Sequence, residues 1–434
     1  MRKFKLEQSK TENLTPHGGL ALVGHCLNQH TSLKKTSRSI AKRHGIPNID
    51  LIGTYLGLIC VGKSDFDAVE ATRNDPFFKA TMGLKQSPSS ARLRQRFDED
   101  AQALIPLLDD ASVELMQNLH IPVNGLSTGH VPVDIDVFPM DNSNTKKEGV
   151  SYTYKGHDGY APIAAYLGRE GWCLACELRP GSQHTNHEFM YALERILPRA
   201  KALCDQPLLM RLDSAHDAAE NRQYLHEQGV DYLIKWNPRK QDLLAWYGKA
   251  NSASLWCHDR LGKMHAVFSE VLNEAPYVRR VIKVTARASD AKGQFFLEPQ
   301  VRLDGWITSL CPETADDQSI MALYRDHATS EQFHSEFKTD LDLERLPSGK
   351  FATNDLVMSF AVLAYNTLRW MGLRGLMGDD APVRHRAKRR RLKTVMQELM
   401  YMACRLVSSG RQLTLRFGQH CPSFKSFSAV YGTI

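Results

Sequence analysis

Two neighbouring acids stand in a strand-like run near position 135. Asp134 and Asp136 alternate with the apolar residues Val133, Ile135 and Val137. Because side chains at i and i+2 of a strand point to the same side, we expect the two carboxylates to lie close together. Such a pair is costly to bury unless a cation is present. The run therefore predicts a divalent cation site or, as the alternative, a strand whose acidic face is hydrated.

A third acid, Asp213, ends the apolar run Pro207–Leu212 just before an expected helix. Ligands of open α/β sheets bind beyond the carboxyl ends of strands, which makes Asp213 a candidate ligand. The alternative is a helix N-cap, because Asp caps helices well. Ser214 or Asp217 could equally serve as the cap, so Asp213 is available for chemistry.

A fourth acid, Glu331, lies in an expected helix near 316–338. Tyr324, His327, Glu331 and Lys338 follow one another at steps of 3, 4 and 7 residues, which places them on one helical face. This set suits a face turned toward metal and phosphate, whereas the alternative is a solvated helix. Strand acids followed by a helix acid are typical of a two-metal phosphoryl-transfer site, and carboxylates are ligands that Mg²⁺ favours.

The elements around these acids predict a mixed α/β core in the order β-β-β-α-β-α-β. Residues 20–120 are predicted to be mostly helical, and alternating runs within 240–310 indicate a β-rich insertion. Helices are expected to resume near 316–338 and 353–372. The expected core elements lie at 131–138, 160–167, 172–178, 186–203, 207–213, 217–228 and 231–235.

The composition is that of a globular protein with a mild basic excess. The 434 residues carry a formal net charge of +7, and 42% of them are hydrophobic. Seven basic residues fall between positions 384 and 393, which favours either a solvated tail or contact with DNA phosphates. There is no apolar signal core, no long uninterrupted apolar run and no disulfide-like cysteine pattern, so we expect a reducing cytoplasm.

One further pattern, Cys173-x2-Cys176 followed by His184-x2-His187, is similar to a set of zinc ligands. The two cysteines, however, lie within an apolar run that predicts a strand. The gap to His184 is also shorter than the usual zinc-finger spacing. The strand interpretation is therefore favoured over a zinc site.

The chain resembles the DDE transposases of bacterial insertion sequences, of the group-1 DDE domain type. The resemblance rests on the segments 133–136, 147–162 and 210–215, on Tyr324, His327, Glu331 and Lys338, and on Asn354 with 364–366. It implies a ribonuclease-H-like mixed-sheet core with a β-rich insertion and a helical N-terminal region. It also implies two Mg²⁺ ions, replaceable by Mn²⁺, held by the catalytic residues Asp136, Asp213 and Glu331, with Asp134 as an additional candidate ligand.

The resemblance also implies a division of the chain. We expect a DNA-binding N-terminal region at 1–125, a catalytic core at 126–239 and 316–378, the insertion at 240–315 and a basic helical region at 379–434. His327 stands where the family signature has Arg. The expected DNA-binding residues are Tyr324, Arg325, His327, Lys338, Arg389, Arg390 and Arg391.

The implied activity is cut-and-paste transposition in a bacterial cytoplasm, with the protein on the nucleoid when bound to DNA. The expected partners are double-stranded transposon ends carrying terminal inverted repeats, target DNA, and a second copy in a homodimer. The alternative is a catalytically idle DNA-binding protein derived from such an enzyme. Three intact acids argue against this alternative, and His327 argues mildly for it.

Overall fold

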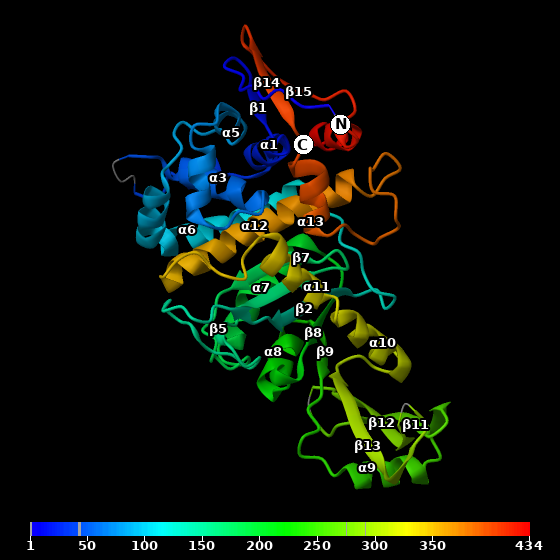
Figure 1. The fold of residues 1–434 in the computed structure, drawn as a ribbon. Helices are drawn as coiled ribbons and strands as arrows, with labels where there is room; N and C mark the ends of the chain where they lie inside the picture. The colour runs from blue at the N-terminus through cyan, green and yellow to red at the C-terminus, as the bar shows by residue number, and fades with distance from the viewer. Residues whose placement is uncertain (1, 42–44, 275, 291) are drawn as a thin grey trace.

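The computed structural model describes residues 2–41, 45–274, 276–290 and 292–434. Figure 1 shows a helical layer with both termini at the top, a central α/β layer below it, and a β-rich lobe that projects from the opposite end. A nine-stranded mixed sheet runs through the central layer and continues into the lobe. The expected mixed α/β class is confirmed.

Five strands form the central part of this sheet, in the spatial order β7-β6-β2-β8-β9. β2 is antiparallel to β6 and parallel to β8, β6 is antiparallel to β7, and β8 is parallel to β9. All of them coincide with runs that the sequence predicted, as do the two intervening helices. The bounds are β2 Val131–Val137, β6 Ile163–Leu167, β7 Trp172–Glu177, α7 Phe189–Leu203, β8 Leu208–Leu212, α8 Ala219–Glu227 and β9 Asp231–Lys235.

Burial of the central strands explains their apolar sequences. Every residue of β8 is buried, and Asp136 alone among the residues of β2 is partly exposed, as expected for strands covered on both faces. Helix α12 (Phe351–Gly375) packs against β7 and against the long helix α6 (Ser90–Asn118). By length and composition α12 could cross a membrane, but 94% of its most apolar window is buried within the fold.

The insertion extends the core sheet. Its last strand pairs antiparallel with β9, Trp306 lying opposite Lys235, and the three other strands follow in antiparallel order. Residues 240–315 are therefore β-rich as expected, with one helix that was not predicted. The bounds are α9 Leu243–Ser252, β10 Trp256–Arg260, β11 Lys263–Val271, β12 Arg279–Ser289 and β13 Phe295–Thr308.

The N-terminal region is mostly helical, as expected. Its longest helix, α6, begins one residue after Ser89, whose hydroxyl accepts a hydrogen bond from the Arg92 amide. The other elements are β1 Asn13–Thr15, α1 Leu20–His30, α2 Leu33–Thr36, α3 Asn48–Cys60, η1 Phe66–Ala68, α4 Val69–Thr72 and α5 Pro76–Thr81.

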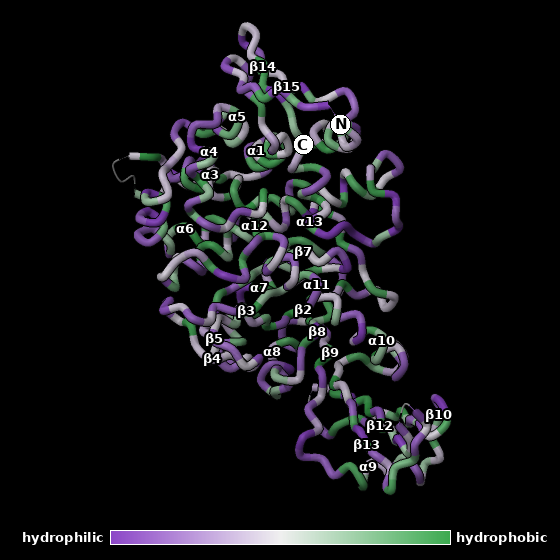
Figure 2. The backbone as a smooth tube through the Cα atoms, viewed as in Figure 1, coloured by the Kyte–Doolittle hydropathy of each residue, from purple (hydrophilic) through white to green (hydrophobic). Residues whose placement is uncertain are grey.

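The C-terminal region differs from the expected basic helix. The basic run up to residue 391 contains no helix, and Figure 2 shows the loop before α13 as largely hydrophilic. A hairpin of β14 and β15 then pairs with β1 in a three-stranded sheet. Clustered like charges disfavour helix formation, and the strand partner β1 is distant in sequence. The bounds are α13 Leu392–Val395, π-helix η4 Met396–Met400, β14 Cys404–Ser409, β15 Gln412–Phe417 and α14 Phe424–Tyr431.

The single helix expected near 316–338 is interrupted. The elements are α10 Asp317–His327, α11 Ser330–Ser335 and π-helix η3 Glu336–Asp340. At the junction of α10 and α11, the amides of Ala328, Thr329 and Glu331 donate to carbonyls three residues earlier. This tighter winding changes the direction of every later side chain. The prediction of one continuous helix that carries Tyr324, His327, Glu331 and Lys338 is therefore wrong, although the rings of Tyr324 and His327 lie 5.4 Å apart.

Candidate active site

Asp136 lies at the carboxyl end of β2, and its side chain is 27% exposed. One carboxylate oxygen accepts a hydrogen bond of 2.8 Å from the Val137 amide. The imidazole of His334 lies behind it, with Nδ1 3.9 Å from the other oxygen. Burial lowers the pKa of His334 to about 3, so this ring is neutral at physiological pH. Asp136 thus faces the site from a largely apolar wall.

Asp134 is committed to a buried ion pair. Its two oxygens accept hydrogen bonds of 2.6 Å from Nε and Nη2 of Arg211, its cross-strand neighbour on β8. Nδ1 of His327 lies 2.8 Å from the same carboxylate. Burial raises the pKa of Asp134, but Arg211 and His327 outweigh burial and hold it below its usual value. Asp134 therefore joins β2, β8 and α10, and both of its oxygens are engaged within the protein.

His327 is 6% exposed and directed at Asp134. The expectation that it binds DNA is wrong, because its ring is enclosed in the fold and bonded to a carboxylate. The residue that departs from the family signature thus has a structural partner that its sequence position did not reveal.

Asp213 follows β8 immediately and is exposed at the start of the short 3₁₀ helix η2 (Ser214–His216). One carboxylate oxygen accepts a 2.6 Å hydrogen bond from the Ser214 amide. One oxygen of Asp213 therefore caps η2, as the N-cap alternative predicted. Asp217 pairs with Arg222 instead of serving as the cap.

Glu331 is exposed in the first turn of α11. Although it is distant in sequence from the two aspartates, Glu331 acts electrostatically on Asp136, as Asp213 does. Burial is the largest cause that raises the pKa of Asp136 to about 6; the charges of Asp213 and Glu331 act in the same direction, and His327 and the Val137 amide act against them. The same three acids add to the effect of burial in raising the pKa of Tyr154 to about 12. Asp136, Asp213 and Glu331 therefore surround one region of the surface.

This region is not a preformed metal cage. In the part of the chain that the structure describes, no three His, Cys, Asp or Glu side chains lie close enough together to hold one metal ion. Because Asp213 and Glu331 are exposed, rotations of their side chains are not restricted by packing.

The sequence matches the family model described as "Transposase DDE domain group 1" over residues 8–434. The chain belongs to this family. Among solved structures it is similar to piggyBac transposase in a cryo-EM synaptic complex with hairpin DNA, with a TM-score of 0.42 and 9% identity, covering 87% of this chain and 79% of that one. No curated protein matches the sequence.

Two residues beside the acids of this transposase escaped the sequence analysis. Lys235 ends β9, the strand next to β8, and its ammonium lies 4.2 Å from the centre of the Trp306 ring and 3.3 Å from Asp304. Burial lowers its pKa, while Asp304 and Asp213 raise it. Because Lys235 is the last residue of a core strand, its position in the sequence could have indicated that it lies near the site.

Tyr154 is the second residue that was missed. It lies in the turn between β4 (Ser151–Tyr152) and β5 (Asp158–Tyr160), which form a small sheet with β3 (Met140–Asp141). Its hydroxyl donates a 3.2 Å hydrogen bond to the carbonyl of Val137, the residue after Asp136, while 64% of the residue is exposed. Only the tertiary contact to β2 distinguishes this tyrosine from its neighbours.

The other expected DNA-binding residues have mixed environments. Tyr324 is half-buried, and burial together with Asp213 and Asp136 raises its pKa. Arg325 is exposed. The ammonium of Lys338 donates to the Pro139 carbonyl at 2.8 Å and pairs with Glu344 at 3.1 Å. Tyr324 therefore lies within electrostatic range of Asp213 and Asp136, whereas Lys338 is held by Pro139 and Glu344.

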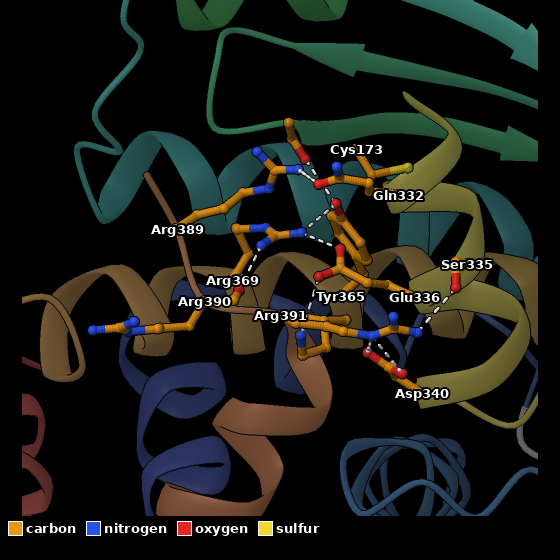
Figure 3. A network of polar contacts seen from close by, with 12 residues as sticks. Cys173, Gln332, Ser335, Glu336, Asp340, Tyr365, Arg369, Arg389, Arg390 and Arg391 are labelled. Carbon is orange, nitrogen blue, oxygen red and sulfur yellow. Dashed lines mark hydrogen bonds and ion pairs between the residues drawn. The ribbon is translucent and has the colours of Figure 1, made fainter. Parts of the chain in front are cut away.

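The three arginines at 389–391 all make contacts inside the protein (Figure 3). Arg390 is 6% exposed and donates to the carbonyls of Leu376, Val383 and His385. The prediction that Arg390 binds DNA is wrong, because its guanidinium is buried and fully engaged. Arg389 and Arg391 contact the helix that carries Glu331.

The cysteines of the zinc-like pattern lie on β7, as the strand interpretation predicted. Cys173 and Cys176 are buried, and burial raises the pKa of both thiols. Because zinc binds the thiolate, this environment disfavours metal binding.

Proposed function

We propose that this transposase cuts and joins DNA at the ends of an insertion sequence, using two divalent metal ions held by Asp136, Asp213 and Glu331. The observation that carries the proposal is the electrostatic convergence of these acids. They come from the end of β2, the end of β8 and the start of α11, and two of them raise the pKa of the third. Acids with no shared structural role are not expected to gather in this way.

The arrangement of the core supports the same conclusion. We infer a ribonuclease-H-like fold from the strand order β7-β6-β2-β8-β9, in which β6 and β7 are antiparallel to β2 while β8 and β9 are parallel to it. Asp136 and Asp213 lie at the carboxyl ends of adjacent parallel strands, where α/β sheets bind their ligands. The β-rich insertion leaves the core at the carboxyl end of β9, the same end of the sheet as Asp136 and Asp213, and returns antiparallel along β9.

The donor set fits Mg²⁺, with Mn²⁺ as a substitute, because all three ligands are carboxylates. A cation would also remove the cost of ionising Asp136 beside Asp213 and Glu331. When bound, such a pair of ions would activate the attacking oxygen and stabilise the leaving oxygen. Asp134 takes no part, because Arg211 and His327 occupy its oxygens.

The remaining residues would hold the DNA. Lys235, Lys338 and Arg325 supply positive charge around the acids, and Tyr154 offers an exposed ring beside Asp136. A water oxygen would attack the phosphorus, the bond to the 3′ oxygen would break, and that oxygen would leave as a 3′-hydroxyl while the water proton passes to solvent. The 3′-hydroxyl would then attack a phosphorus of the other strand or of the target. Because two ends must be handled together, we propose a homodimer on paired inverted repeats.

The test is Mg²⁺-dependent cleavage of DNA that carries the ends of the element. Asp136→Ala, Asp213→Ala and Glu331→Ala should each lower the rate by roughly a hundredfold or more, since metal ions supply several kcal/mol of transition-state stabilisation. Asp205→Ala, which removes an exposed acid elsewhere, is the matched control. If one of these variants cuts as fast as wild type, the residue that it replaces is not a metal ligand. A wild type that binds DNA and never cuts would favour the idle DNA-binding protein.

A further inference from the structure

The helix that carries Glu331 has little intrinsic stability. α11 has six residues, lacks a side-chain hydrogen bond at its N-cap Thr329, and runs directly into the π-helix η3. Isolated helices of this length are unstable in water, and π-helical turns are rare and occur frequently at functional sites. The position of Glu331 therefore depends on the residues that pack against α11 and η3.

Aromatic rings hold the inner face of this segment. Phe333 lies with its ring centre 4.8 Å from that of Tyr166, and Phe337 stacks on Tyr365 at 4.7 Å. These contacts fix the depth of the helix against the core. They involve no residue on its outer, exposed side, where Gln332, Ser335 and Thr339 lie.

The outer face is held by the segment Arg389–Lys393, which we call the C-terminal clasp (Figure 3). Arg389 donates to Oε1 of Gln332 at 2.8 Å, directly beside Glu331. Arg391 donates to Ser335 at 2.9 Å, to Thr339 at 2.8 Å and to both oxygens of Asp340. The clasp therefore contacts α11 and η3 from end to end.

Backbone groups and buried charges anchor the clasp. The amide of Leu392 donates to Glu336 at 3.1 Å and that of Lys393 donates to Asp340 at 3.0 Å. Glu336 also pairs with the buried Arg369, which in turn donates to the Arg390 carbonyl at 2.9 Å. Glu336 is 3% exposed and Asp340 is 7% exposed. Because buried charge pairs hold groups in one geometry, the clasp has a defined position relative to the core.

We propose that the C-terminal clasp positions Glu331 for metal binding, and that Arg389 and Arg391 are positioning residues instead of phosphate contacts. The inference rests on the proposed function of Glu331. It divides the basic run by role: Arg384, Arg386 and Lys388 are exposed and available to DNA, and Arg389 and Arg390 are engaged within the protein. Arg391 is about half exposed, but its guanidinium is held by Ser335, Thr339 and Asp340. Partners of metal ligands of this kind typically change metal affinity by about 10–100-fold when they are removed.

The test compares variants that open the clasp with variants that remove only surface charge. Arg389→Ala and Gln332→Ala each remove one side of the same hydrogen bond, and Gln332→Ala does so without changing charge. Arg391→Lys keeps the charge beside Asp340 but cannot bond to Ser335 and Thr339 together. Arg386→Ala and Lys388→Ala are the controls.

Three quantities are measured in the full-length protein: the Mg²⁺ concentration for half-maximal cleavage, the Kd for end DNA without metal, and hydrogen–deuterium exchange over 330–340. We expect the clasp variants to need about tenfold more Mg²⁺, with a Kd within about twofold of wild type and faster exchange. The controls should weaken DNA binding and leave the other two quantities unchanged. Arg389 also stacks on the Phe333 ring at 4.4 Å, so Arg389→Ala removes the Gln332 hydrogen bond and this contact together, and the double variant should be no worse than Arg389→Ala alone.

Two results would overturn the inference. One is a loss of DNA affinity in Arg389→Ala and Arg391→Lys equal to that in the controls, with an unchanged Mg²⁺ requirement. The other is unchanged exchange over 330–340 in all clasp variants. A wild type that never cleaves would overturn the proposed function, and the exchange measurement would still decide whether the clasp holds the helix.

Discussion

Replacing Asp136 by Asn should make the metal-free protein more stable while abolishing cleavage. Burial, with a smaller effect of Asp213 and Glu331 in the same direction, raises the pKa of Asp136 from an ordinary value of 3.8 to about 6. Each pKa unit is worth about 1.36 kcal/mol, so ionised Asp136 costs the fold at most about 3 kcal/mol. Because the side chain is 27% exposed, solvent screening reduces this figure, and we expect a gain of about 1–3 kcal/mol.

The sign of the pH dependence follows from the raised pKa. Between pH 4 and 6 the folded wild type binds a proton at Asp136 that the unfolded chain has lost, so wild-type stability falls as pH rises through this window. Asn carries no charge and still accepts the Val137 hydrogen bond. The advantage of Asp136→Asn should therefore be near zero at about pH 4 and complete above about pH 6.5.

The assay is urea unfolding in EDTA at several pH values, followed by thermal unfolding with and without Mg²⁺. For a cooperative unit of 434 residues, the expected gain corresponds to a rise in Tm of roughly 1–3 °C. Mg²⁺ should raise the Tm of wild type by mass action and leave that of Asp136→Asn nearly unchanged. A variant that is less stable than wild type at pH 7.5, or a difference that does not vary with pH, would refute the reasoning.

Three further predictions concern the surroundings of the acids. Arg211→Ala leaves the buried Asp134 with His327 alone and should lower the free energy of unfolding by about 3–5 kcal/mol in urea; a loss below about 1 kcal/mol would contradict the pairing. Lys235→Ala should lower end-DNA affinity about tenfold and reduce the salt dependence of binding by one charge, whereas Lys240→Ala, which removes an exposed lysine nearby, should match wild type. Tyr154→Phe should keep cleavage near wild type and Tyr154→Ala should lower it, and equal losses would assign the effect to the hydroxyl instead of the ring.

The strands and helices of the core were predictable because their signals are local. β2, β8 and β9 are short, largely apolar runs, and the positions of Asp136 and Asp213 follow from where β2 and β8 stop. The interruption at Ala328 was not predictable from periodicity. It directly follows His327, whose partner Asp134 lies far away in sequence.

The basic run shows the same limit for charged residues. Seven basic residues within 384–393 favoured phosphate contact, yet the partners of Arg390 and Arg391 are carbonyls and carboxylates supplied by other parts of the fold. A charge count records how many cations a segment has. It does not show which carboxylates the fold places near those cations. In the folded chain, a hydrogen bond between an arginine and a buried carboxylate is stronger than its contact with solvent.

By itself, the sequence predicted the mixed α/β class and the β-rich insertion, because alternating apolar residues and turn residues are local signals. Its motifs indicated the family and the candidate acids. The family resemblance favoured Asp136 over Asp134, and the tertiary structure shows a physical difference between the two acids. Both acids lie on one side of the same strand, and what separates them is Arg211 on the next strand and His327 on α10. Those two partners engage Asp134, while Asp136 is left facing Asp213 and Glu331.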